Sequence, residues 1–155
     1  MPYPEIKKIN DAVTLVVDAL KTEFGKELEV RDETDERIET YKTNHPNGAV
    51  LVLYDGAKYS DRNNENIVFL ERNMRIACLL QVRVEKGLMY KNDMIERMTD
   101  AVSGLKFETF GKTDKVFPAT DEYNIPQQEK DKTFYEHTIV FIVPSQYEEK
   151  NYLNQ

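Results

Sequence analysis

Few side chains in this chain are suited to metal binding or nucleophilic chemistry, because it has two histidines and one cysteine. His45 and His137 are far apart in the sequence, and neither has a second ligand-type residue at a metal-binding spacing such as i+4 on a helix. His137 alternates with Tyr135, Ile139 and Phe141, which predicts a hydrogen-bonded, half-buried strand residue rather than a general base. His45 falls in an expected turn and should be exposed. The histidines therefore predict no metal site.

The other candidates for chemistry are also better explained by structure. Cys78 alternates in phase with Ile76 and Leu80, which predicts a buried packing residue, and a single cysteine excludes an intrachain disulfide. The polar run Asp61–Asn66 partly resembles a calcium loop, but Asn66 stands where the sharp turn needs glycine. The six glycines are scattered singly, so no phosphate-binding loop is present. We therefore expect no cofactor and no enzymatic activity.

The overall charge is acidic, with 28 Asp and Glu residues against 21 Lys and Arg residues and a formal net charge of −7. This balance argues against sequence-independent binding to nucleic acid, which needs clustered Lys and Arg. No window approaches the ~18 apolar residues of a membrane span, and the N-terminus has no apolar core of signal-peptide length. We expect a soluble cytoplasmic product without membrane or specific nucleic-acid partners.

The elements that would position any site start with a central strand at residues 49–54, which is apolar on both faces. Pro46-Asn47-Gly48 predicts a tight turn before this strand and Asp55-Gly56 a turn after it, because glycine reaches positive φ values. Both faces of such a strand must be covered. The core is therefore expected to form around it.

Residues 67–84 predict a second, long strand with one apolar and one polar face. Its eighteen residues would span ~60 Å, so the strand is expected to bend or to project as an arm. Ala77 and Leu79 lie on the otherwise polar face, and we expect a helix to cover part of it. Arg75 and Arg83 share that face, and Arg83→Gln is expected to change stability by less than ~0.5 kcal/mol outside an interface.

Two helices and a last strand complete the predicted fold. Apolar residues recur at helical spacing near 4–24 and near 93–103, and residues 134–143 are dense in aromatic and β-branched types up to Pro144. The strands at 49–54, 74–84 and 134–143 should lie side by side in an antiparallel or mixed β-sheet flanked by both helices. The sequence thus predicts one α/β domain over residues 1–146 and a polar C-terminal tail over residues 147–155.

Residues 106–132 show no regular periodicity, and charged residues stand between the aromatic ones. A structureless connection of this length is uncommon inside a compact domain, so a functional loop that contacts a partner is expected. Such a loop should contribute little to the core. Its aromatic residues are Phe107, Phe110, Phe117 and Tyr123.

Several turn and strand motifs also occur in the order of a known family. They are His45-Pro46-Asn47-Gly48-Ala49, then Tyr54, Gly56 and Tyr59, then the strand at 75–84 and the helix end Val102-Ser103-Gly104-Leu105. Together they resemble the tail-terminator family of Mu-like contractile-tailed phages and related contractile injection systems. Phe134-Tyr135 stands where relatives often have a tryptophan, and residues 106–132 have no counterpart.

The resemblance implies a structural protein that forms a ring, commonly of six copies, on the last ring of a tail tube. Such a ring stops tube growth and joins the sheath or connector, so the implied partners are copies of the chain, the tube protein, and sheath or connector proteins. It also implies assembly in the host cytoplasm, followed by a place in the virion tail or in a cytoplasmic contractile assembly. No catalytic residues are implied.

A head-to-tail ring needs two different complementary patches on each subunit. The long strand and the aromatic loop are the candidate sources of one of them. The residues predicted for the interfaces are Arg75, Leu79, Arg83, Phe107, Phe110, Phe117 and Tyr123.

Two other classes of protein stay open. A small cytoplasmic acidic binding module or adaptor would be favoured by a concave pocket lined with Phe107, Phe110 and Phe117. An enzyme that uses an acidic residue in a cleft is the other class, although the sequence contains no suitable site constellation.

Overall fold

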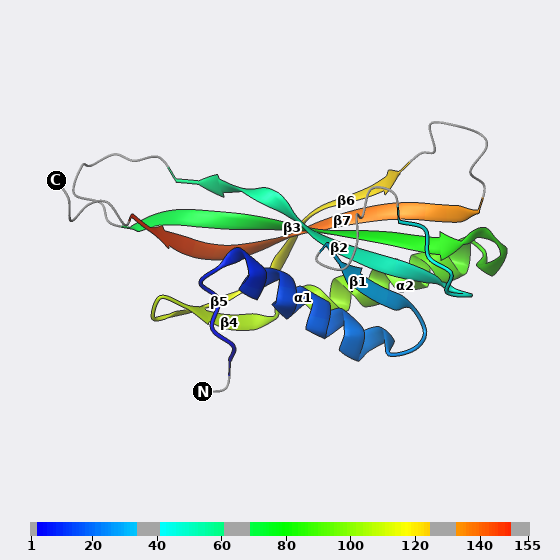
Figure 1. Ribbon diagram of the computed structural model, residues 1–155, viewed down its shortest axis with the longest axis horizontal. Helices are drawn as coiled ribbons and strands as arrows, with labels where there is room; N and C mark the ends of the chain where they lie inside the picture. Colours follow the sequence, from blue (N-terminus) through cyan, green and yellow to red (C-terminus); the bar gives the residue numbers. More distant parts are fainter. Residues whose placement is uncertain (1–2, 34–40, 61–68, 125–132, 150–155) are drawn as a thin grey trace.

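The computed structural model describes residues 3–33, 41–60, 69–124 and 133–149 (Figure 1). The expected Asp61–Asn66 loop, residues 125–132 of the expected functional loop and most of the expected C-terminal tail lie outside the described residues.

A five-stranded sheet in the order β1-β2-β3-β7-β6 forms the frame of the molecule. The edge strand β1 (Glu29–Asp32) is parallel to β2 (Gly48–Tyr59), whereas β3 (Phe69–Arg83), β7 (Phe134–Glu148) and β6 (Phe117–Asn124) continue the sheet with antiparallel pairing. The three predicted strands are therefore neighbours, as expected. The mixed α/β fold predicted from the sequence is confirmed.

Both helices pack against one face of this sheet (Figure 1). The alternation of β3 places Ile76, Cys78 and Leu80 on that face, where all three are fully buried against α1 (Ile9–Phe24) and α2 (Leu88–Val102). Burial raises the pKa of the Cys78 thiol, so this cysteine is an unreactive packing residue, as its alternation predicts. We call this side of the sheet the helical face.

The helices begin at other residues than predicted. Before α1, the backbone N–H groups of Lys7 and Lys8 donate to the Asp11 carboxylate at 3.1 and 3.0 Å, which fixes a turn there. The preceding residues are extended, because Ile6 N–H donates to the carbonyl of Glu108 at 2.7 Å. α1 therefore starts at Ile9 rather than near residue 4, and α2 starts at Leu88 rather than near residue 93.

The opposite side of the sheet, which we call the open face, carries no helix, so the predicted helical cover of Ala77 and Leu79 is wrong. The extended segment 41–47 lies along part of this face instead. Gln81 Nε2 donates to the Tyr41 carbonyl at 3.2 Å, and Arg83 donates to the carbonyls of Thr43 and His45 at 3.1 and 2.9 Å. Gln81 and Arg83 therefore bind backbone carbonyl groups of this segment.

The expectation of a loop over residues 106–132 is also wrong for its described part, because that part forms three strands. A two-stranded sheet of β4 (Lys106–Thr109) and β5 (Lys112–Lys115) is followed by β6, which pairs with β7. Phe107 and Val116 are buried in the core at 0% and 1% exposure, so this segment does contribute to stability. A bulge between Pro118 and Thr120 disrupts the period-two alternation that would have predicted β6.

Two strands continue past their predicted ends. β2 crosses Asp55-Gly56 through a bulge between Tyr54 and Ala57, where Gly56 has a φ of 91°, and runs on to Tyr59. β7 passes Pro144 and reaches Glu148, so residues 147 and 148 of the predicted tail are part of a strand. The pairing of β6 with β7 ends at Ile142, so Pro144 has no β6 residue beside it. Proline is tolerated at such a position because no β6 carbonyl needs its missing N–H group.

Candidate functional site

The seven residues predicted for the interfaces do not form one cluster. Arg75, Leu79 and Arg83 lie on the open face by their alternation in β3, and Phe117 lies on it opposite Ile142 of β7. The other three are elsewhere: Phe107 is fully buried in the core, Phe110 is in the connection between β4 and β5, and Tyr123 is on the helical face of β6.

Apolar side chains form a band across the open face. The cross-strand registers align Leu53 with Ala77 and Val140, and Leu51 with Leu79. Leu51, Ala77 and Val140 are buried in this band, whereas Leu53 and Leu79 remain half-buried and Phe117 at the β6 edge is 48% exposed. An apolar band without a helix over it is the kind of surface that another subunit covers.

Polar groups border this band on two sides. The Tyr41 hydroxyl donates to the Glu29 carboxylate, and Thr43 Oγ1 donates to the same carboxylate at 2.9 Å. Desolvation by burial, with the hydrogen bond to Glu29, raises the pKa of Tyr41. Nearer the arm, Arg75 is paired with Asp55 at 3.5 Å, and the two side chains are 38% and 47% exposed. Such an exposed pair contributes little to stability, so both residues are available for contacts with a partner.

The second candidate surface is the end of the sheet where β2, β3 and β7 extend past the start of α1 (Figure 1). We call this end the arm, and it agrees with the projecting strand predicted from residues 67–84. Tyr59, Phe69 and Tyr147 remain 45%, 43% and 39% exposed there. Tyr59 packs edge-to-face on Tyr147 with ring centroids 6.1 Å apart, and Phe69 packs on Phe110 at 5.5 Å. Clustered exposed aromatic residues are typical of interface cores.

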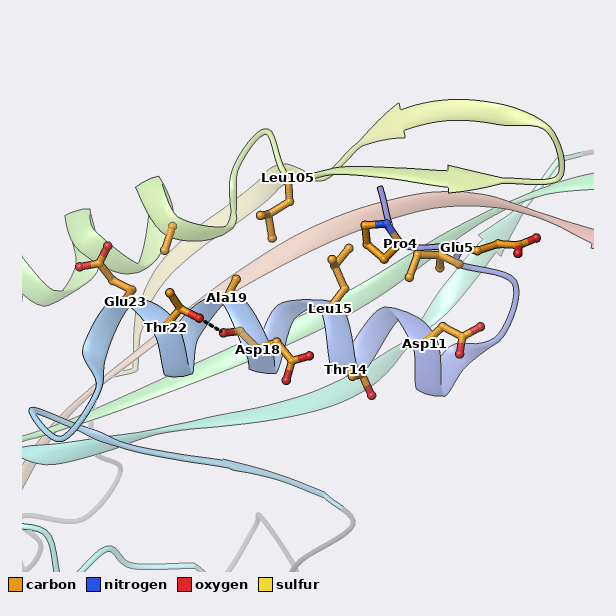
Figure 2. Close-up of a pocket in the computed structure, with 12 residues that line it drawn as sticks. Pro4, Glu5, Asp11, Thr14, Leu15, Asp18, Ala19, Thr22, Glu23 and Leu105 are labelled. Carbon is orange, nitrogen blue, oxygen red and sulfur yellow. Dashed lines mark hydrogen bonds between the residues drawn. The ribbon is translucent and has the colours of Figure 1, made fainter. Parts of the chain in front are cut away.

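A groove along α1 is the third candidate surface, with a volume of about 750 Å³. Figure 2 shows Leu15 of α1 and Leu105, which follows α2, pointing into it from opposite sides, while Asp18 lies at its rim. Glu23 at one end is engaged by Arg97 of α2 at 3.1 Å. The groove is therefore apolar inside and acidic at its edge, which suits an apolar segment with basic flanks.

The two histidines bind different partners within the fold. His137 Nε2 contacts the Asp121 carboxylate diagonally across β6 and β7, while its buried Nδ1 has no partner among the described residues. This arrangement confirms a hydrogen-bonded strand residue, although His137 is buried at 9% exposure rather than half-buried. His45 is partly buried rather than exposed, because its Nε2 donates to the Lys26 carbonyl at 2.8 Å while Nδ1 accepts from Asn47 N–H at 3.1 Å.

Other chemistry finds little support in the described residues. Within them, no group of three or more His, Cys, Asp or Glu side chains could hold a metal ion. None of the helices in the described ranges is long and apolar enough to cross a membrane. Because Phe107 is in the core, the pocket of Phe107, Phe110 and Phe117 considered for an adaptor is not formed.

Sequence reasoning missed the arm aromatics and the α1 groove. Tyr147 falls in the predicted tail. Phe69 falls in the predicted strand at residues 67–84, but a strand pattern does not show that its side chain would gather with aromatic residues of other segments. The apolar and acidic side chains of the groove are all present in the helical pattern. Whether these side chains form a groove depends on where Pro4 and Leu105 pack, and the spacing of apolar residues in a helix does not predict this packing.

The comparisons with known proteins give one family match. The family model described as Gp37 protein matches residues 12–149. The match includes α1 from Ala12 onward, every strand of both sheets and α2. No curated protein matches the chain.

Proposed function

The chain belongs to the Gp37 protein family, which is phage-associated, and from this premise we propose that it is a structural tail-terminator protein. In this proposal copies of the chain close into a ring, with six as the expected number, on the last ring of the tail tube. The ring stops tube growth and offers a surface to the sheath or connector. It assembles in the host cytoplasm and remains in the tail.

The observation that carries the proposal is that each subunit has two different apolar surfaces, each with at least one exposed aromatic side chain. The arm has Tyr59, Phe69 and Tyr147, and the open face has the band that ends at Phe117. A head-to-tail ring uses two different patches on each copy, and the chain offers both. The motifs at residues 45–59 and 102–105, which resemble tail terminators, support the same assignment.

A second candidate function is an acidic binding module, favoured by the α1 groove. Its interior is apolar and its rim has Asp11 and Asp18, so it would bind a basic amphipathic segment of one partner. A binding module would act as a monomer, whereas a terminator must close into a ring. The oligomeric state in isolated tails therefore separates the two functions.

The direct test is tail length in electron micrographs after deletion of the gene. We expect tubes that are overlong or variable in length, because nothing stops their growth. Supplying the intact chain from a plasmid should restore the uniform length. Uniform tails of normal length in the deletion would refute the terminator role, and a monomeric copy on finished tails would favour the binding module.

A further inference from the structure

Arg72 of β3 is a buried cation that has no counter-ion among the described residues. The residue is 8% exposed, its Nη2 donates to the Lys7 carbonyl at 2.9 Å, and its guanidinium lies over the Tyr147 ring at 5.6 Å. Its Nε is buried and has no hydrogen-bond partner, and no carboxylate of the described residues is paired with it. Arginine is almost never buried unless it is paired, because an uncompensated charge is strongly unfavourable.

The same residue lines a pocket where the arm meets the start of α1, with a volume of about 630 Å³. Lys7 and Lys8 add two cationic side chains at the pocket, and Ile9 and Asn10 form the first turn of the helix. The dipole of the helix start favours an anion, although the N–H groups of Lys7 and Lys8 already donate to the Asp11 carboxylate. In a chain with net charge −7, this pocket is a local concentration of positive charge.

The negative groups nearby do not neutralise this pocket. Lys7 pairs with Glu5 at 2.9 Å, but both side chains are at least half exposed, and such pairs are weak. Glu148 also lines the pocket and already has an interaction partner, and it forms no ion pair with Arg72. The pocket therefore has capacity for one more anionic group.

The rest of the lining favours a peptide carboxylate over phosphate. Phe110 and Tyr147 give the pocket aromatic walls, which suit an apolar residue beside the anion. The planar guanidinium fits a carboxylate by two parallel hydrogen bonds. A nucleic acid would bring many phosphates towards an acidic chain, which repels them.

We propose that this pocket binds a Glu or Asp side chain, flanked by an apolar residue, on a peptide segment of a neighbouring protein subunit. The bound carboxylate supplies the counter-ion that Arg72 lacks. The inference deepens the proposed function and rests on it for the source of the peptide, which is another subunit of the tail assembly.

The test is an NMR titration of the full chain labelled with ¹⁵N, following the Nε–Hε signal of Arg72. The probe is the peptide acetyl-Phe-Glu-Leu-amide, and its matched control is acetyl-Phe-Gln-Leu-amide. We expect a saturable shift of this signal with the Glu peptide and at least tenfold weaker binding of the Gln peptide. Inorganic phosphate and a single-stranded DNA dodecamer should bind more weakly than the Glu peptide.

Two variants test the residues themselves. Arg72→Met should abolish peptide binding, followed by other pocket signals, while raising the thermal midpoint, because it removes an unpaired buried charge without a large loss of volume. Lys8→Gln, at an exposed position, should keep the fold and weaken binding about threefold. Equal binding of the Glu and Gln peptides, full binding by Arg72→Met, or tighter binding of phosphate or DNA would overturn the proposal.

The outcomes separate this inference from the terminator role. If the peptide does not bind but deletion of the gene gives overlong tails, the pocket proposal falls and the terminator role stands. If the peptide binds but tails without the gene keep their length, the pocket stands and its assignment to a tail partner falls.

Discussion

At the scale of single residues, Leu80 carries the strongest expectation. It is fully buried between the sheet and the helices, so Leu80→Asp would place an unpaired charge in the core. The cost of several kcal/mol is a large part of a total stability of ~5–15 kcal/mol. We expect an unfolded or insoluble product. Circular dichroism and solubility check this.

The control for Leu80→Asp is the same change at Leu88, which is 56% exposed. Leu88 is the first residue of α2, where a negative charge suits the helix dipole. Leu88→Asp should therefore change the free energy of unfolding by less than ~0.5 kcal/mol. Equal melting temperatures of the two variants would show that Leu80 is not in the core.

Arg83 illustrates how a polar residue with a predicted exposed position can be structural. Its two hydrogen bonds hold segment 41–47 on the open face, and its guanidinium lies 5.0 Å from the Phe134 ring centroid. We therefore replace the small effect expected from the sequence with a loss of ~1–3 kcal/mol for Arg83→Gln. Urea unfolding measures this, and a loss below ~0.5 kcal/mol would restore the original expectation.

The buried thiol predicts how stability depends on pH. The folded protein keeps the Cys78 proton to a higher pH than the unfolded chain, whose thiol ionises near ~8.5. Above that pH the unfolded state binds fewer protons, so stability falls as pH rises. Between pH 7.5 and 9.5 the wild type should lose ~1 kcal/mol more than Cys78→Ala in urea unfolding. Equal losses would contradict the raised thiol pKa.

At the scale of elements, the close pairing of β2 with β3 depends on Gly48. Its φ is 142°, and a Cβ atom there would lie 2.0 Å from the carbonyl oxygen of Gln81. Gly48→Ala must therefore push the strands apart, with a cost of at least ~3 kcal/mol. Gly56, at a φ of 91° with open space around it, is the matched control, and Gly56→Ala should cost ~1 kcal/mol. Denaturant midpoints compare them, and equal losses would argue against the clash.

The elements that were predicted correctly are those with an undisturbed period. Residues 49–54, 74–84 and 134–143 alternate or are apolar on both faces, and all three are neighbouring strands. β6 was missed because its bulge at Pro118 shifts the alternation, and β5 because its four residues are all exposed. The extended residues before α1 were read as helix because Ile6 keeps a helical spacing although it packs beside β4.

At the scale of the whole molecule, the sequence indicated part of the candidate site. It placed Arg75, Leu79 and Arg83 together on one face, because alternation in a strand fixes the face. It did not separate Phe107, which is buried, from Phe117, which is exposed, because no period was visible there. The arm and the α1 groove arise from contacts between distant segments, and local patterns carry no information on these.

The last prediction concerns assembly and uses Phe117 at the edge of the open face. It is 48% exposed, so Phe117→Arg should leave the melting temperature of the monomer nearly unchanged. In a ring this position would face a neighbour, and a charge in an apolar interface would block closure. We expect overlong tails with this variant, whereas Leu88→Arg, at a position 56% exposed on α2, should give tails of normal length. Normal tails with a folded Phe117→Arg chain would remove the open face from the interface.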